Sequence, residues 1–178
     1  MRSSRVAKRY ARALLGLSND RNQLEAWGAE LVQLARVIET PEIAAAFESP
    51  EVSMSAKIQA LATITDKLGS SFPVRSFTTV VARHGRIPDL PAVADVYGRM
   101  LDDLMGRARA TLTFARQPGD SDIRRIVDKL EQIAHKQIIP TIKIDDALLG
   151  GVVVELEGKT YDGSLTSRLL EAQQRLVG

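Results

Sequence analysis

Two pairs of adjacent aspartates, Asp102-Asp103 and Asp145-Asp146, are the residues of this sequence that come nearest to an acid–base site. Paired carboxylates work as general acid and base when both face one reacting group. Neighbouring residues, however, diverge around a helix and point to opposite faces of a strand. We therefore expect both pairs to be solvated surface residues rather than catalytic dyads.

Histidine, serine and glycine offer no stronger chemistry. His84 and His135 stand alone, without the spacing of metal ligands. Ser164 has no histidine nearby in the sequence to activate it, and a helix N-cap explains it better. Gly150-Gly151 leads into a strand, and no phosphate-binding loop of the form G-x-x-x-x-G-K-[ST] is present. The sequence predicts no catalytic residue, no cofactor and no metal.

Composition is that of an ordinary globular protein. The 178 residues suffice for one domain or two small ones, and 44% of them are hydrophobic, enough for a packed core. Aromatic residues make up 4%, too few for a base-stacking surface, and the net charge is only +2. Without cysteine there is no disulfide or thiol chemistry. No apolar run approaches the ~20 residues that span a bilayer.

The elements that position these residues change in type along the chain. Apolar residues recur at helical spacing through the first hundred residues, broken by Pro41, Ser49-Pro50 and Gly85. This pattern predicts a six-helix bundle joined by short loops over residues 1–106.

From residue 107 the pattern is mixed. Thr111–Phe114 and Pro140–Asp145 alternate as strands on either side of a helix that Asp120 or Ser121 is expected to cap. The fold class is therefore α+β, with a small α+β domain over residues 107–178.

Turn residues organise the end of the chain. Gly150-Gly151 opens an alternating strand, and Glu157-Gly158 lies where a short hairpin turn is expected. Asp162-Gly163-Ser164 closes the second strand, with Asp162 bonding local backbone amides and Ser164 capping a helix. Gly158 and Gly163 are expected to supply backbone freedom. One face of the final helix is formed by Leu165, Leu169, Ala172 and Leu176.

The first helix has two unlike faces. The charged face consists of Arg5, Lys8, Arg9 and Arg12. It is either a solvated face or a surface that attracts an acidic partner or a membrane. The apolar face consists of Tyr10, Ala13, Leu14 and Leu17. It is either bundle core or, because alanine lets a backbone approach closely, a shallow groove for another helix; the residues alone favour core.

Three segments in fixed order carry a family resemblance. They are Arg9-Tyr10-Ala11-Arg12-Ala13-Leu14, then Phe77–Ile87 with its ending His84-Gly85-Arg86-Ile87, and the stretch from Leu148-Leu149-Gly150-Gly151 to Asp162-Gly163-Ser164. Together they resemble the delta subunit of bacterial F-type ATP synthases, whose mitochondrial counterpart is the oligomycin-sensitivity-conferring protein. Leu149 replaces the family's isoleucine and keeps its volume. Glu157-Gly158 replaces Gly-Asp, so the turn differs.

The resemblance implies a non-catalytic subunit of the peripheral stalk of a proton-translocating ATP synthase, linking the alpha/beta catalytic head to the b subunits. Residues 1–106 would hold the N-terminal helix of an alpha subunit, and residues 107–178 would face the C-terminal region of the b subunits. The protein would lie on the cytoplasmic side of a bacterial cell membrane, attached only through the complex. The implied alpha-binding residues are Tyr10, Ala13, Leu14, Leu17, Phe77, Val80 and Val81.

Two other classes of protein compete with this interpretation. A small helical nucleic-acid-binding protein would explain the basic first helix, but it needs base and phosphate contacts that an aromatic-poor chain does not display. A small enzyme would need converging polar groups, and none is evident.

Residues 1–19, basic and free of acidic residues, also resemble a transit peptide. Because the Tyr10-Ala11 motif lies within them, we expect mature bacterial protein.

Overall fold

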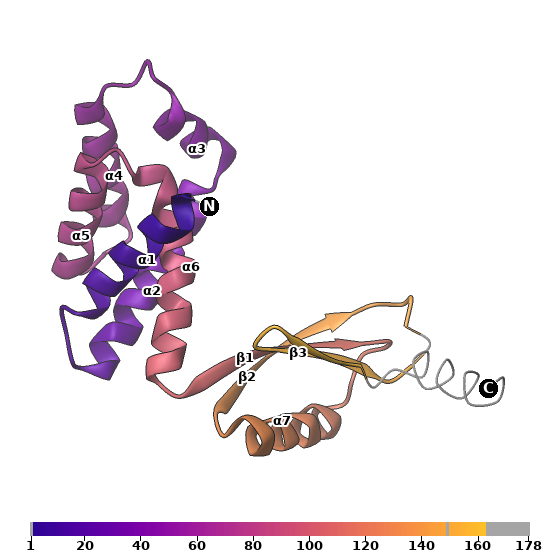
Figure 1. Ribbon diagram of the computed structural model, residues 1–178. Coiled ribbons are helices and arrows are strands. Elements are labelled where there is room, and N and C mark those ends of the chain that lie inside the picture. The colour runs from indigo at the N-terminus through magenta and orange to yellow at the C-terminus, as the bar shows by residue number, and fades with distance from the viewer. Residues whose placement is uncertain (1, 149, 163–178) are drawn as a thin grey trace, which may run out of the picture. The chain divides into compact units, whose positions relative to one another are not determined.

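The computed structural model describes residues 2–148 and 150–162, with side chains from residue 5 onward (Figure 1). The chain divides into two compact units, Met1–Met105 and Gly106–Gly178, with the boundary one residue before the predicted position. The described part of the first unit is helical, whereas the second unit contains a sheet and a helix. The fold is therefore α+β.

The first unit consists of helices joined by short loops. They are α1 Arg2–Leu15, α2 Arg21–Ile38, α3 Pro41–Glu48, α4 Met54–Lys67, α5 Phe72–Arg83 and α6 Leu90–Leu104, with a 3-10 turn η1 Ile87–Asp89 before α6.

Helix ends fall at residues that satisfy the free backbone groups there. Ser53 precedes α4, and its hydroxyl accepts a hydrogen bond of 3.2 Å from the Ala56 N–H. Past the end of α5, Gly85 takes a φ of +67°, and the Arg86 N–H donates to the Val81 carbonyl at 3.1 Å. This confirms the glycine C-cap that the sequence predicts.

Helix α6 packs against both α1 and α2 and organises the core of this unit (Figure 1). Tyr97 of α6 is fully buried, and its hydroxyl donates a 2.9 Å hydrogen bond to the Leu24 carbonyl oxygen of α2. Burial raises the pKa of Tyr97 to about 12, because the phenolate would lose its hydration. Other large side chains that are fully buried here are Leu14, Leu24, Leu31, Leu34, Leu61, Val74, Val81, Ile87, Leu90 and Val93.

Helix α5 is held in place by polar contacts to two other helices. The Glu30 carboxylate of α2 accepts hydrogen bonds from the Ser71 N–H and hydroxyl, each 2.9 Å long. Ser71 precedes α5, where the helix dipole favours a negative charge. Arg75 of α5 forms an ion pair of 2.8 Å with Asp66 of α4. These contacts fix the α5 side chains that face α1.

The second unit is built on one four-stranded sheet in the order β2-β1-β3-β4. Strands β1 and β2 are parallel, β3 is antiparallel to β1, and β4 is antiparallel to β3. A parallel pair needs a long crossover connection, which α7 supplies. The elements are β1 Arg107–Phe114, α7 Asp120–Ala134, β2 Gln137–Ile144, β3 Val152–Leu156 and β4 Lys159–Asp162.

Alternate residues of β1 form the core of the second unit. Its buried side chains belong to one face of the sheet, against which α7 packs with Leu130. The other members of this core are Ala108, Ala110, Leu112, Phe114, Ile138, Val154 and Leu156.

The turns around β3 follow the prediction, and one predicted helix cap does not. Glu157 and Gly158 take φ values of 49° and 79°, and this two-residue turn with both φ values positive joins β3 to β4. Gly151 takes a φ of 86° before β3. The expected cap at Asp120 or Ser121 is wrong, because α7 begins at Asp120 and its N-cap is Gly119.

The last predicted features are only partly described. Strand β4 spans Lys159–Asp162 and reaches the last described residue, so the predicted end of the strand at Asp162-Gly163-Ser164 stays a prediction. Gly163, Ser164 and the helix predicted after them lie outside the described residues.

Candidate functional site

An apolar groove of about 620 Å³ lies on the surface of the first unit, between α1, the start of α2 and α5. Its lining residues are Tyr10, Ala13, Leu17, Gln23, Trp27, Phe72, Pro73, Ser76, Phe77 and Val80. None of them is charged, so the groove is suited to an apolar partner surface and not to an ionic ligand.

Aromatic side chains form the floor of the groove. The Tyr10 and Phe77 rings meet edge to face, with centroids 6.2 Å apart and planes at 79°. Tyr10 and Phe77 are each 8% exposed and Trp27 is 6% exposed, so their rings are largely packed into the protein. An edge-to-face pair is a favourable aromatic geometry, and here it joins α1 to α5.

Large apolar side chains stand exposed around this floor. Leu17 is 64% exposed, Phe72 is 74% exposed and Val80 is 49% exposed. Single exposed apolar residues are common, but three around one groove are typical of a surface that binds another molecule. Ala13 is also exposed, and its small side chain leaves room for a close approach.

The structure brings together five of the seven residues that the sequence assigned to partner binding. Tyr10, Ala13, Leu17, Phe77 and Val80 all line the groove. Leu14 and Val81 do not, because each is 0% exposed and belongs to the core beneath it. Their assignment to the binding surface is therefore corrected. Leu17 lies just past the end of α1, whose last residue is Leu15.

Sequence reasoning missed Phe72, Pro73 and Trp27 as groove residues. Trp27 falls on the apolar stripe of α2 with Leu24 and Leu31, a pattern that indicates a core position. Phe72 is the first residue of α5, outside the apolar stripe that reaches the core. A phenylalanine directly before a proline at the start of a helix was the signal that the sequence offered for it.

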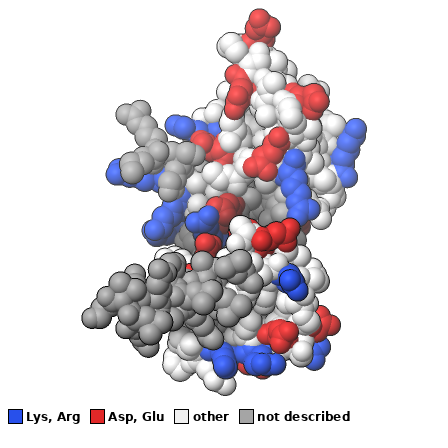
Figure 2. Space-filling view, turned by 90° about the vertical axis from the view of Figure 1, so that its right-hand side faces the viewer, with Lys and Arg blue, Asp and Glu red and all other residues white. Residues whose placement is uncertain are grey.

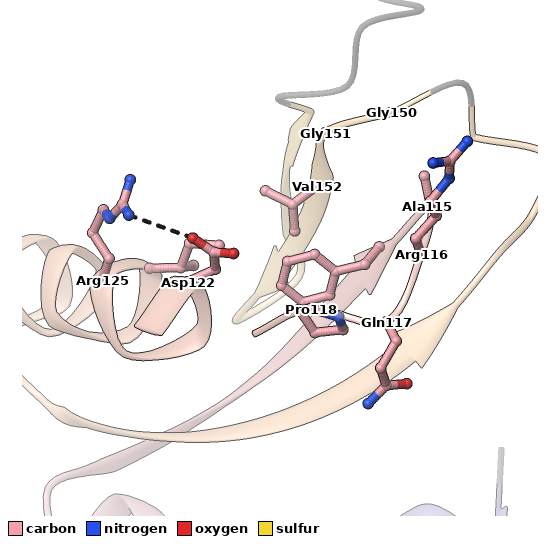
Figure 3. Close-up of a pocket in the computed structure, with 11 residues that line it drawn as sticks. Ala115, Arg116, Gln117, Pro118, Asp122, Arg125, Gly150, Gly151 and Val152 are labelled. Carbon is pink, nitrogen blue, oxygen red and sulfur yellow. Dashed lines mark hydrogen bonds and ion pairs between the residues drawn. The ribbon is translucent and has the colours of Figure 1, made fainter. Parts of the chain in front are cut away.

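The second unit carries a separate cavity of about 560 Å³ at the end of its sheet, near the start of α7. Arg125 forms an ion pair of 3.4 Å with Asp122 of the same helix. Figure 3 shows Arg116 on the side of the cavity opposite Arg125. The polar groups do not converge on one point, as binding or acting on a small polar ligand would require.

The aspartates and histidines singled out for chemistry are spread over the structure. Asp102 is 8% exposed whereas Asp103 is exposed, so this pair diverges around α6 as expected. The expectation that both aspartates of the pair are solvated is wrong for Asp102, which is buried. The Asp145 carboxylate accepts a 3.0 Å hydrogen bond from the Ala147 N–H in a turn. His84 lies at the end of α5, with Nδ1 2.8 Å from the Val80 carbonyl oxygen. Among residues 2–148 and 150–162, no three metal-binding side chains cluster.

Surface charge and helix length add two observations. Figure 2 shows basic and acidic side chains mixed over the face that it presents, without a continuous basic surface there. Nucleic-acid binding draws on clustered positive charge.

No helix in the described part of the chain is both long and apolar enough to cross a bilayer.

Comparison with known proteins identifies the family. The family described as "ATP synthase delta (OSCP) subunit" matches residues 6–176. Proteins named ATP synthase subunit delta from Geobacter metallireducens and Gemmatimonas aurantiaca are 32% and 33% identical to this chain. The first alignment covers 99% of this chain and 98% of the relative, and the second covers 97% and 94%.

A solved structure has the same fold. It is a chain in the cryo-EM structure of the Toxoplasma gondii mitochondrial ATP synthase hexamer, with a TM-score of 0.68 at 20% identity over 97% of each chain. The nucleic-acid-binding alternative has no support in these matches. The chain belongs to the ATP synthase delta (OSCP) subunit family and is a non-catalytic subunit of the enzyme's peripheral stalk.

Proposed function

We propose that this subunit joins the catalytic head to the peripheral stalk by binding one partner with each unit. The Met1–Met105 unit acts as a six-helix bundle that holds the N-terminal helix of an alpha subunit in its apolar groove. The Gly106–Gly178 unit contacts the C-terminal region of the b subunits. The joint lies on the cytoplasmic side of the membrane and is attached to the membrane only through the complex.

The groove is the observation that carries this proposal. Its aromatic floor and exposed rim suit an amphipathic helix that buries one apolar face, the recurring way in which a groove binds a helix. Ala13 allows the partner backbone to come close, and Leu17, Phe72 and Val80 supply apolar area that loses water on binding.

The second unit has its own exposed apolar side chains. Ile142 and Ile144 of β2 are 40% and 51% exposed, and Tyr161 of β4 is 43% exposed. They pair in register with the core residues Leu112, Phe114 and Val154, so all three belong to the core-forming face of the sheet. This part of the face stays exposed among the described residues and supports a second partner contact, which we assign to the b subunits.

Two contacts on one subunit explain how the joint resists torque. Rotary catalysis requires the head to stay still while the central shaft turns. Once one unit is bound, the other is held near its partner at a high effective concentration, so the joint outlasts either contact alone. This role needs no bond chemistry in the subunit.

The test is calorimetric titration of a synthetic peptide, the N-terminal segment of the alpha subunit of the same organism, into three proteins. These are the wild type, Ala13→Asp in the groove and Ala29→Asp on an exposed part of α2 outside it. We expect wild type and Ala29→Asp to bind alike. Ala13→Asp should bind at least about tenfold more weakly, because its carboxylate must be desolvated against an apolar partner.

Circular dichroism provides the folding control. Both variants should keep the helix content and melting behaviour of the wild type, because both alanines are exposed. A folded Ala13→Asp protein with wild-type peptide affinity would refute the groove as the binding site. Peptide that binds none of the three proteins would refute the assignment of the alpha partner.

A further inference from the structure

We propose that the helix in the groove carries a row of acidic side chains on its flank facing α1, and that these pair with Arg5 and Arg9. The inference rests on the proposed function and adds the chemistry of the partner: an amphipathic helix with one apolar face and one acidic edge. It also gives the basic row of α1 a role that the apolar groove alone does not explain.

The basic row borders the groove directly. Arg5, Lys8, Arg9 and Arg12 are all exposed. With Ala13 they line a shallow cavity of about 450 Å³, and Ala13 also lines the apolar groove. The two surfaces therefore meet at Ala13. A helix lying in the groove would have one edge next to positive charge.

Arg9 holds its charge at the rim of the groove. Its guanidinium carbon lies 5.3 Å from the centroid of the Tyr10 ring, within the range of a cation–π contact. Tyr10 is part of the groove floor. The stacking limits how far the long Arg9 side chain can swing into solvent, so less conformational entropy is lost when a carboxylate binds it.

The basic row has no acidic partner within the described part of the protein, in contrast to several other exposed arginines. Arg75, Arg99 and Arg125 each pair with an aspartate at 2.7 to 3.4 Å. Arg5 and Arg9, one helical turn apart, form no ion pair with a described residue and repel each other instead. Carboxylates from a bound helix would relieve this repulsion.

Helix geometry divides the four cations into two pairs. At about 100° per residue, Arg9 lies about 40° and Arg5 about 80° around α1 from Ala13, whereas Arg12 and Lys8 lie about 100° and 140° away. Arg5 and Arg9 continue the i, i+4 row of the groove residues Ala13 and Leu17 and so border the occupant. Lys8 and Arg12 lie on the next row, farther from the groove, although Arg12 is only about 20° from Arg5 around the helix. The rise from Arg5 to Arg9 is about 6 Å, which two carboxylates at i and i+4 on the partner match.

The experiment compares two variants with the same loss of charge. Arg5→Gln/Arg9→Gln removes the pair at the rim, and Lys8→Gln/Arg12→Gln removes the pair behind it. Each is titrated with the alpha N-terminal peptide near physiological salt, where the Debye length of about 8 Å suppresses long-range attraction. We expect the rim variant to bind roughly 3- to 10-fold more weakly, and the control variant to stay within about twofold of wild type.

A charge reversal provides the second readout. Arg9→Glu should weaken binding further, and a peptide in which the facing acidic residue is changed to lysine should recover affinity for Arg9→Glu only. Equal losses in the two double variants would overturn the inference, as would an alpha segment without acidic residues along one flank of its apolar stripe.

Other outcomes separate this inference from the proposed function. In one outcome, Ala13→Asp abolishes peptide binding, but neither salt nor the Arg5→Gln/Arg9→Gln change alters the peptide affinity. That outcome would overturn only the acidic edge. Absence of any peptide binding would overturn both. Binding of the wild type to phosphatidylcholine–phosphatidylglycerol vesicles that the rim variant loses, with peptide affinity unchanged, would assign Arg5 and Arg9 to a membrane surface and overturn the inference.

Discussion

Tyr10 and Phe77 meet edge to face across the junction of α1 and α5, with ring centroids 6.2 Å apart. The two residues are 67 positions apart in the sequence, and each is 8% exposed. Their contact couples the two walls of the groove, so the partner helix that we propose would meet a floor that is already formed. Such preorganisation lowers the entropy lost on binding.

Leu14 and Leu17 should respond in opposite ways to truncation, because Leu14 is 0% and Leu17 is 64% exposed. Leu14→Ala should lower the free energy of unfolding of the first unit by about 2–5 kcal/mol, whereas Leu17→Ala should change it by no more than about 0.5 kcal/mol. Urea titration followed by fluorescence of Trp27, the single tryptophan, reports on this unit. Leu17→Ala should instead weaken peptide binding. Similar unfolding curves for the two variants would contradict the division into core and rim.

Tyr97 should make the stability of the first unit fall at high pH. Its folded pKa of about 12 lies above the usual tyrosine pKa of 10.0, so the protonated phenol stabilises the folded state. That contribution is complete below about pH 10 and is lost as the pH rises from 10 through 12, because the unfolded state releases the proton first. Tyr97→Phe removes this dependence and the hydrogen bond to Leu24, at a cost of about 0.5–1.5 kcal/mol.

The measurement is the difference in unfolding free energy between wild type and Tyr97→Phe across pH 8 to 11.5. The difference should be constant at the lower end and shrink above pH 10. A difference that stays constant over the whole range would show that Tyr97 titrates normally.

Gly151 should tolerate some side chains and not others, since its φ is 86°. Gly151→Val places a β-branched residue in that conformation and should destabilise the second unit by roughly 1–3 kcal/mol. Gly151→Asn should cost less, because asparagine adopts positive φ more readily. Hydrogen exchange resolved by residue should show lost protection after residue 106 in Gly151→Val and unchanged protection before it. Equal effects of valine and asparagine would argue against backbone strain as the cause.

Local signals in the sequence predicted many elements well. Gly85 ends α5 as predicted, and Glu157-Gly158 forms the turn between β3 and β4. Each depends on the conformation of a few neighbouring residues, which residue type largely determines. The start of β1 at Arg107 was missed because Arg107 and Arg109 occupy the face of the sheet opposite the core and carry no apolar signal.

The groove could be predicted only in part, for a physical reason. Helical spacing puts Leu14 and Leu17 on one face of the first helix, but where that face stops being covered depends on how α5 and α2 pack beside it. Phe72 lies on the rim because α5 begins next to Glu30 of α2. The Ser71 N–H donates a hydrogen bond to the Glu30 carboxylate, and these two residues are 41 positions apart in the sequence. Contacts of that range leave no periodic trace in the sequence.

The most direct test of the central claim uses the absence of cysteine in this chain. Single cysteines at Leu17 and Val80 on the groove rim, and at Ala29 outside it, would each carry a photoreactive cross-linker in the assembled ATP synthase. The account predicts that Leu17→Cys and Val80→Cys cross-link to the N-terminal segment of an alpha subunit, and that Ala29→Cys does not. Cross-links from both rim positions to a b subunit, or to no subunit while the complex remains intact, would contradict it.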